Sequence, residues 1–207
     1  MSLLPFLIAA LVLAITPGPG IAYVVARTVA GGRGEGLASC LGTAVGGLLH
    51  VLAAALGLSL LIAQSAWTFS VLKYLGAAYL VYLGLRILLG QRSPAAADLP
   101  AVQASGLRRA FFEGAVVEAL NVKTALFFLA FLPQFVSPAQ PLVEQLVFLG
   151  CICVSLNTLA DFVAVLIAHR LLRAGAARAA RERLMTRVSG LTLLGLGAFL
   201  ALARRET

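Results

Sequence analysis

Six side chains that can bind or exchange ions lie inside long apolar segments of the sequence. They are His50, Glu118, Asn121, Lys123, Asn157 and Asp161. Asn157 and Asp161 are four residues apart, so on a helix they share one face. Carboxylates and an ammonium group can together bind the opposite charges of a zwitterion, and histidine and carboxyl groups exchange protons. The set therefore indicates binding of a small charged solute, coupled to protonation.

The pentapeptide at residues 16–20 interrupts the first apolar run near its centre. Its members are Thr16, Pro17, Gly18, Pro19 and Gly20. Each proline removes a backbone donor and clashes with the preceding turn, so we expect a helix break here. Unpaired backbone groups survive at membrane depth only where they face protein or a wet cavity, and transporters bind solute at such breaks. A simple proline kink is the structural alternative.

The elements that must position these residues are membrane spans, because the composition excludes an ordinary soluble domain. The chain has 207 residues, 61% hydrophobic and only 12% charged, with a mean hydropathy of +0.99. A soluble domain of this size would have too little polar surface to face water. The net charge of +8 does not indicate nucleic-acid binding, since all the arginines lie in connections, at span ends or in the tail.

The predicted fold is all-α, with six transmembrane helices in a single transmembrane domain, residues 1–207. A spanning helix needs about twenty mainly apolar residues. The sequence offers six such segments, at 3–26, 37–63, 66–89, 110–136, 142–169 and 187–204. The first, third and fifth connections with their flanks hold two, four and six arginines, while the second and fourth hold no lysine or arginine. The positive-inside rule places the odd connections in the cytoplasm and both termini outside.

We expect the polar groups of four spans to meet halfway across the membrane and bind substrate there. The cargo's carboxylate would meet the half-helix ends, helped by Lys123, and its ammonium group would meet Glu118, Asp161 or freed carbonyls. An ionisable side chain at this depth costs a few kcal/mol, so none of these groups should face lipid. The predicted substrate-binding residues are Thr16, Pro17, Gly18, Pro19, Gly20, Asn121, Lys123 and Asn157.

Three residues are candidates for proton coupling: His50, Glu118 and Asp161. Burial favours the neutral form of a carboxyl group, which can bring its titration toward neutral pH. Structural alternatives stay open for two of the three. His50 is then an interhelical hydrogen bonder, and Glu118 forms an ion pair with Lys123. Asp161 has no basic neighbour in its own span.

A weak internal sequence similarity predicts two repeats of three spans each. Lys73-Tyr-Leu-Gly begins the third span and Arg187-Val-Ser-Gly begins the sixth. The broken first span likewise corresponds to the fourth, which carries Asn-Val-Lys at 121–123. An odd number of spans per repeat makes the two halves inverted, as in many secondary transporters.

Four stretches carry a resemblance that covers nearly the whole chain. They are TPGPG, HVLAAALGL, LKYLGAAYLVYLGLRIL and ALNVKTALFFLAFLPQFV. In these stretches the sequence resembles the LysE/RhtB family of amino-acid exporters, of the homoserine and threonine efflux type. The resemblance implies six helices in a bacterial inner membrane, and export of amino acids or similar small metabolites driven by the proton gradient.

The chain departs from that family at several polar positions. The family usually has Asn-Pro-Lys at 121–123, so the resemblance implies a softer second break here. Glu118 stands where relatives often carry a neutral amide. Many relatives have an aspartate at Asn157, so in this chain the carboxylate of Asp161 lies one turn later. Basic-amino-acid exporters carry an aspartate near His50, and its absence favours a neutral substrate.

Two other classes of function compete with proton-coupled export. A membrane enzyme for thiol electron transfer would need a dithiol at the breaks, but Cys40, Cys151 and Cys153 lie elsewhere, so we expect no enzyme. A passive channel or a non-transporting scaffold subunit stays open. We expect no cofactor, metal or nucleic acid; the expected partners are the small-molecule substrate, membrane lipids and, in a homodimer, a second copy of the chain.

Overall fold

A computed structural model describes residues 3–58, 103–137 and 139–174, together with scattered positions between 67 and 89. Throughout this described part the regular structure is helical, in agreement with the predicted all-α class. The expected span at 187–204 and most of the one at 66–89 lie outside the described residues. So do Lys73 and Arg187, on which part of the predicted repeat depends. Six spans and an inverted repeat therefore remain predictions.

The first apolar run is broken where the two prolines predict. Helix α1 covers Leu3–Ile15 and helix α2 starts at Pro19 and runs to Ala53. Gly18, the N-cap of α2, is extended, with φ −131° and ψ −171°. Proline suits the first helical position because its missing N–H would have no partner there. The interruption is therefore a helix break and not a simple kink.

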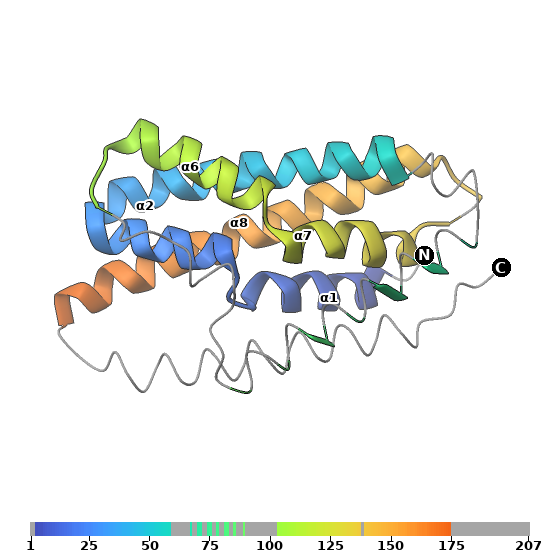
Figure 1. The fold of residues 1–207 in the computed structure, drawn as a ribbon, viewed down its shortest axis with the longest axis horizontal. Helices are drawn as coiled ribbons and strands as arrows, with labels where there is room; N and C mark the ends of the chain where they lie inside the picture. The colour runs from blue at the N-terminus through green and yellow to red at the C-terminus, as the bar shows by residue number, and fades with distance from the viewer. Residues whose placement is uncertain are drawn as a thin grey trace.

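Helix α2 (Pro19–Ala53) reverses direction at Gly32. This glycine has φ 77° and ψ −174°, a backbone conformation that side chains other than glycine rarely adopt. Arg27 pairs with Glu35 across the reversal at 3.3 Å, whereas residues eight apart on a straight helix are separated by about 12 Å. Figure 1 shows α2 doubling back at this point. The helix of the first span therefore continues past the predicted limit of 26 to about residue 31, and the next helix begins near residue 33, before the predicted limit of 37.

The fourth apolar run is also broken. Helix α6 covers Leu107–Ala119 and helix α7 covers Val122–Leu126, continued by η2 (Phe127–Phe131) and η3 (Leu132–Phe135). The two parts meet at an angle of 43°. Asn121 forms the N-cap of α7, and its side-chain oxygen accepts a hydrogen bond from the Lys123 backbone N–H at 3.1 Å. The Asn-Val-Lys segment thus starts a new helix in the middle of the predicted span at 110–136.

Helix α8 (Leu142–Ala174) is continuous and extends the predicted span at 142–169 by five residues. By length and composition, Leu142–Arg170 and Pro19–Gly57, which the reversal at Gly32 divides, each contain a stretch that can cross a membrane. The bent pair of α6 and the helix from Val122 to Phe135 makes a third candidate. Figure 1 shows the reversal of α2, the start of α6 and the end of α8 at the same end of the molecule. These are the arginine-bearing segments that the positive-inside rule assigns to the cytoplasm.

Glycines let α2 and α6 approach backbone to backbone. A Cβ atom added to Gly42 would lie 2.0 Å from the carbonyl oxygen of Phe111, and one added to Gly46 would lie 2.4 Å from that of Ala115. From the other helix, a Cβ on Gly114 would lie 2.6 Å from the carbonyl oxygen of Ser39. Such close approach is typical of small residues at helix interfaces in membranes. It brings the break after α6 next to the break before α2.

A phenylalanine-rich core lies on the other side of the two breaks. Its largest fully buried side chains are Phe6, Leu13, Phe127, Phe128, Phe131, Leu132, Leu146 and Leu149. They come from α1, η2, η3 and α8, so α1 and the segment that continues α7 pack together against α8. This packing fixes where the breaks sit, because each half-helix is held by apolar contacts on its own side.

Candidate functional site

Lys123 reaches from the second break to the first. Its ammonium group donates to the backbone oxygen of Thr16 at 2.8 Å and to that of Leu13 at 3.2 Å. Leu13 lies in the last turn of α1 and Thr16 follows its last residue, and a helix C-terminus carries a partial negative charge. Lys123 is 8% exposed. It therefore neutralises the end of α1 from a different span.

Glu118 lies against the opposite side of the same break. A Cβ atom added to Gly20, in the first turn of α2, would lie 2.5 Å from Oε2 of Glu118. The partial positive charge of a helix N-terminus favours a carboxylate there. Asn121 Nδ2 donates to Oε2 at 2.9 Å and the Thr124 hydroxyl donates to Oε1 at 2.6 Å. The residues around the second break thus supply opposite charges to the two ends of the first.

Helix α8 presents a second buried carboxyl group. Asp161 is 5% exposed, and its Oδ2 lies 2.7 Å from the hydroxyl oxygen of Thr43 on α2. Asn157, one turn earlier on the same helix, donates to the sulfur of Cys153 at 3.7 Å. The shared face that the four-residue spacing predicts is present, because Asn157 and Asp161 line one cavity.

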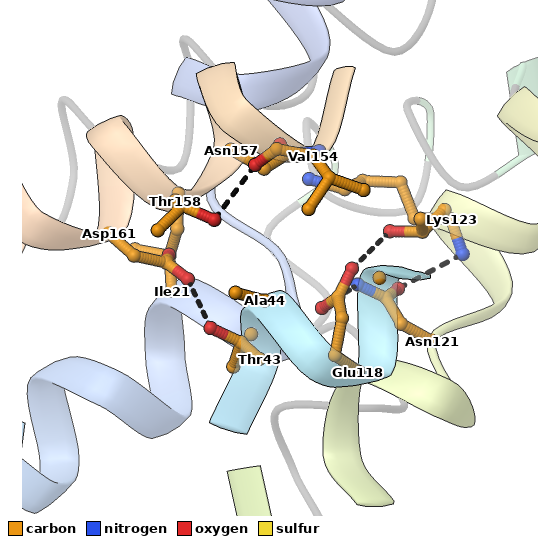
Figure 2. A pocket seen from close by; sticks show the side chains of 13 residues that line it. Ile21, Thr43, Ala44, Glu118, Asn121, Lys123, Val154, Asn157, Thr158 and Asp161 are labelled. Carbon is orange, nitrogen blue, oxygen red and sulfur yellow. Dashed lines mark hydrogen bonds between the residues drawn. The ribbon is translucent and has the colours of Figure 1, made fainter. Parts of the chain in front are cut away.

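That cavity lies between α8, the second half of α2 and the break after α6. Figure 2 shows Asp161 and Thr43 on one side of it, and Glu118, Asn121 and Lys123 on the other. Its volume is about 20 Å³, and one water molecule needs roughly 10–15 Å³ on this measure. An amino acid therefore fits only after lining side chains move. The predicted residues that line the cavity are Gly20, Glu118, Asn121, Lys123, Asn157 and Asp161.

The other predicted residues lie around the cavity and not on its wall. Thr16, Pro17, Gly18 and Pro19 form the break itself, where the carbonyl of Thr16 accepts from Lys123. His50 places Nε2 2.8 Å from the backbone oxygen of Glu118. Since a carbonyl oxygen only accepts, that nitrogen carries a hydrogen. This arrangement is the interhelical hydrogen bond that was the structural alternative for His50.

Three threonines of the cavity wall were not predicted: Thr43, Thr124 and Thr158. Thr43 belongs to the segment GTAVGG, whose small residues predict close packing and give no sign of a polar site. Thr124 lies three residues after Asn121, and Thr158 lies one residue after Asn157, so both follow predicted site residues. The signal that could have found these two threonines is their place one to three residues after a residue already predicted to lie in the site.

A buried ionic cluster at the arginine-bearing end was also missed. Arg27, only 3% exposed, pairs with Glu35 at 3.3 Å and with Glu113 through its other terminal nitrogen. Glu35 accepts hydrogen bonds from the backbone N–H groups of Ser105 at 2.9 Å and Gly106 at 2.8 Å. The cluster ties the reversal of α2 to the start of α6. The reversal at Gly32 brings Arg27 and Glu35 together, and the packing of α6 against α2 adds Glu113, 86 residues from Arg27.

Comparisons with known proteins indicate the family to which the chain is similar. A family model described as LysE type translocator matches residues 11–204. An uncharacterized membrane protein of Vibrio cholerae is 30% identical over 97% of each chain. The homoserine/homoserine lactone efflux protein of Salmonella typhimurium is 32% identical over 70% of this chain and 69% of the relative. The membrane protein YrhP of Bacillus subtilis is 33% identical over 76% and 79%. No solved structure matches the chain significantly.

Proposed function

Because the chain belongs to the LysE type translocator family of bacterial membrane exporters, we propose that it exports a neutral amino acid or a similar small metabolite. Export is coupled to the proton gradient, with protons entering as cargo leaves. The arginine-bearing end of the molecule faces the cytoplasm, and cargo enters the transporter from this end. One relative is named a homoserine/homoserine lactone efflux protein. We extend that class of cargo, small polar amino acids, to this chain.

The observation that carries the proposal is the crossing of two broken helices at one cavity. Its wall combines an ammonium group, Lys123, with two carboxyl groups, Glu118 and Asp161. A zwitterion presents one carboxylate and one ammonium group, so its two charges find partners on opposite walls. Its carboxylate binds near Asn121 and Lys123, and its ammonium group binds near Asp161. At membrane depth such groups are retained where they face a polar path.

The small volume of the cavity indicates how cargo is admitted. About 20 Å³ excludes an amino acid in this conformation, so transport requires the helices around the breaks to move apart. Alternating access in secondary transporters works by such rocking about a central site. A passive channel would instead need a continuous wet path, and within the described residues the cavity is too small to provide one.

The decisive experiment compares metabolites inside and outside cells that overexpress the chain. We expect one amino acid, or a small related group, to accumulate in the medium and to fall inside the cells. In proteoliposomes, export of that compound should stop when an uncoupler collapses the proton gradient. Leak that persists without a gradient would favour the channel. Unchanged export from Asn121→Ala and Asp161→Ala variants would contradict the site assignment.

A further inference from the structure

The hydroxyl group of Thr43 stands between two oxygen atoms but has one hydrogen to donate. Its oxygen lies 2.7 Å from Oδ2 of Asp161 and 2.8 Å from the backbone oxygen of Cys40. Both distances are those of ordinary hydrogen bonds. A backbone carbonyl can only accept, and a threonine hydroxyl donates once and accepts elsewhere. Both contacts are therefore hydrogen bonds only if Asp161 donates one of them.

A neutral Asp161 satisfies this arrangement completely. Its carboxyl O–H donates to Thr43, and Thr43 donates to the carbonyl of Cys40. With an ionised Asp161, the hydroxyl hydrogen turns to the carboxylate, and the Thr43 oxygen then faces the Cys40 carbonyl at 2.8 Å with no hydrogen between them. The geometry thus favours the protonated acid.

Glu118 has the opposite hydrogen-bond pattern. The side-chain oxygen of Asn121 accepts from the Lys123 backbone N–H, so its NH₂ group faces Glu118 and donates to Oε2. Within the described residues, Thr124 has Oε1 of Glu118 as the one acceptor for its hydroxyl hydrogen. Both oxygens of Glu118 therefore accept, as an ionised carboxylate does. Lys123 balances its charge across the break.

The charges around the cavity also favour a neutral Asp161. Among the described residues, the charged or titratable groups that face Asp161 are Cys40 on α2, Glu118 on α6 and Lys123 on α7. Lys123 and Glu118 compensate one another, which leaves an ionised Asp161 as the unpaired charge. An unpaired buried charge is costly, and a proton on Asp161 leaves the groups around the cavity without net charge.

We infer that Asp161 carries the exchanged proton, and that the Thr43 hydroxyl positions it by reversing its hydrogen bond. When the proton leaves for water, the carboxylate remains and the Thr43 hydrogen rotates from the Cys40 carbonyl to Oδ2. The freed negative charge is then available to the ammonium group of the cargo. Because the proton and the ammonium group of the cargo compete for the same carboxylate, they cross the membrane in opposite directions. This inference rests on the proposed function and selects one of the three candidates, His50, Glu118 and Asp161.

Infrared difference spectroscopy of the full chain in lipid tests the protonation directly and needs no cargo. At neutral pH we expect the C=O band of a neutral carboxyl group to be lost in Asp161→Asn and retained in Glu118→Gln. In Thr43→Val the band should move to higher frequency, because its hydrogen-bond acceptor is gone, while Thr43→Ser should leave it in place. A band that is lost in Glu118→Gln, or unmoved in Thr43→Val, would overturn the inference even if Asp161→Asn failed to fold.

Titrating the same band with pH separates a positioning role of Thr43 from a purely structural one. A hydrogen bond to an ionised acceptor is stronger than one to a neutral acceptor, so the Thr43 hydroxyl stabilises the carboxylate form of Asp161. Thr43→Val should therefore shift the midpoint of the band's titration to higher pH, and Thr43→Ser should restore it. If no cargo is exported but these band results hold, the proposed function fails and the assignment of the proton stands. Export that persists while Asp161 shows no neutral band would instead reject the assignment alone.

Discussion

The ammonium group of Lys123, on the second broken helix, lies 2.8 Å from the carbonyl oxygen of Thr16 at the first break. This contact joins two segments that are 107 residues apart in the sequence. Together with Glu118 against the first turn of α2, it gives each end of the first break a counter-charge. The breaks are therefore parts of one site, and changes at either should affect both.

Replacing Lys123 with methionine should disable export and weaken the fold. It leaves the carbonyls of Leu13 and Thr16 without their donor, and an unpaired buried group costs about 1–3 kcal/mol. Thermal unfolding in detergent and export in proteoliposomes measure the two effects. Val122 is 48% exposed, and Val122→Ala serves as the matched control with near-normal behaviour. A Lys123→Met variant that exports normally would show that this contact is dispensable.

Replacing Gly20 with alanine should displace Glu118. The new methyl group would lie 2.5 Å from Oε2, so the end of the Glu118 side chain must move away and lose its hydrogen bonds to Asn121 and Thr124. We expect export to fall roughly tenfold, which corresponds to about 1.4 kcal/mol. In Gly57→Ala the added atom meets nothing within 4 Å, so that variant should behave like the wild type. Equal export from both variants would argue against close packing at Gly20.

Local rules were enough to predict the first break and the shared face of α8. Two prolines interrupt a helix whatever surrounds them, and Asn157 and Asp161 share a face because of helical periodicity alone. Long-range partners escaped prediction. Thr43 looks like a packing residue until Asp161, 118 residues away, is placed beside it. The choice between the two roles of His50 likewise depends on the carbonyl of Glu118, 68 residues away.

The helix ends around the first connection differ from the predicted span limits for a related reason. The sequence GGRGEG after Ala30 indicates a turn, but it does not say which glycine takes the positive φ. Once Gly32 does so, the helix continues past residue 26 to the reversal, and Arg27 becomes buried. An arginine counted as a marker of the cytoplasmic side is also part of a buried cluster with Glu35 and Glu113.

Replacing Arg27 with methionine should destabilise the chain strongly. Its removal leaves Glu35 buried without its cation, and breaking one partner from a buried pair costs about 3–5 kcal/mol. Arg109 pairs with the same Glu113, but its side chain is 70% exposed, so Arg109→Met should cost only about 0–1 kcal/mol. Thermal unfolding of the two variants side by side checks the difference. Similar losses from both would mean that burial of the cluster contributes little.

Removing all three cysteines should leave export intact. Cys40 and Cys153 are buried and Cys151 is exposed, and Cys153 is the one whose sulfur accepts from a cavity residue, Asn157. We expect the Cys40→Ala, Cys151→Ala, Cys153→Ala triple variant to export the same compound with unchanged dependence on the proton gradient. Thiol chemistry would be implicated if export vanished while the variant remained folded, as judged by its thermal unfolding.

The most direct test asks whether cargo occupies the cavity where the two broken helices cross. In the cysteine-free variant, Ile21→Cys places one thiol on the cavity wall through an apolar lining residue. Leu11→Cys places a control thiol at a position that is 51% exposed on α1. The exported amino acid should slow labelling of the first by a small thiol reagent and leave the second unchanged. If saturating cargo protects neither thiol, or both equally, cargo does not bind in this cavity.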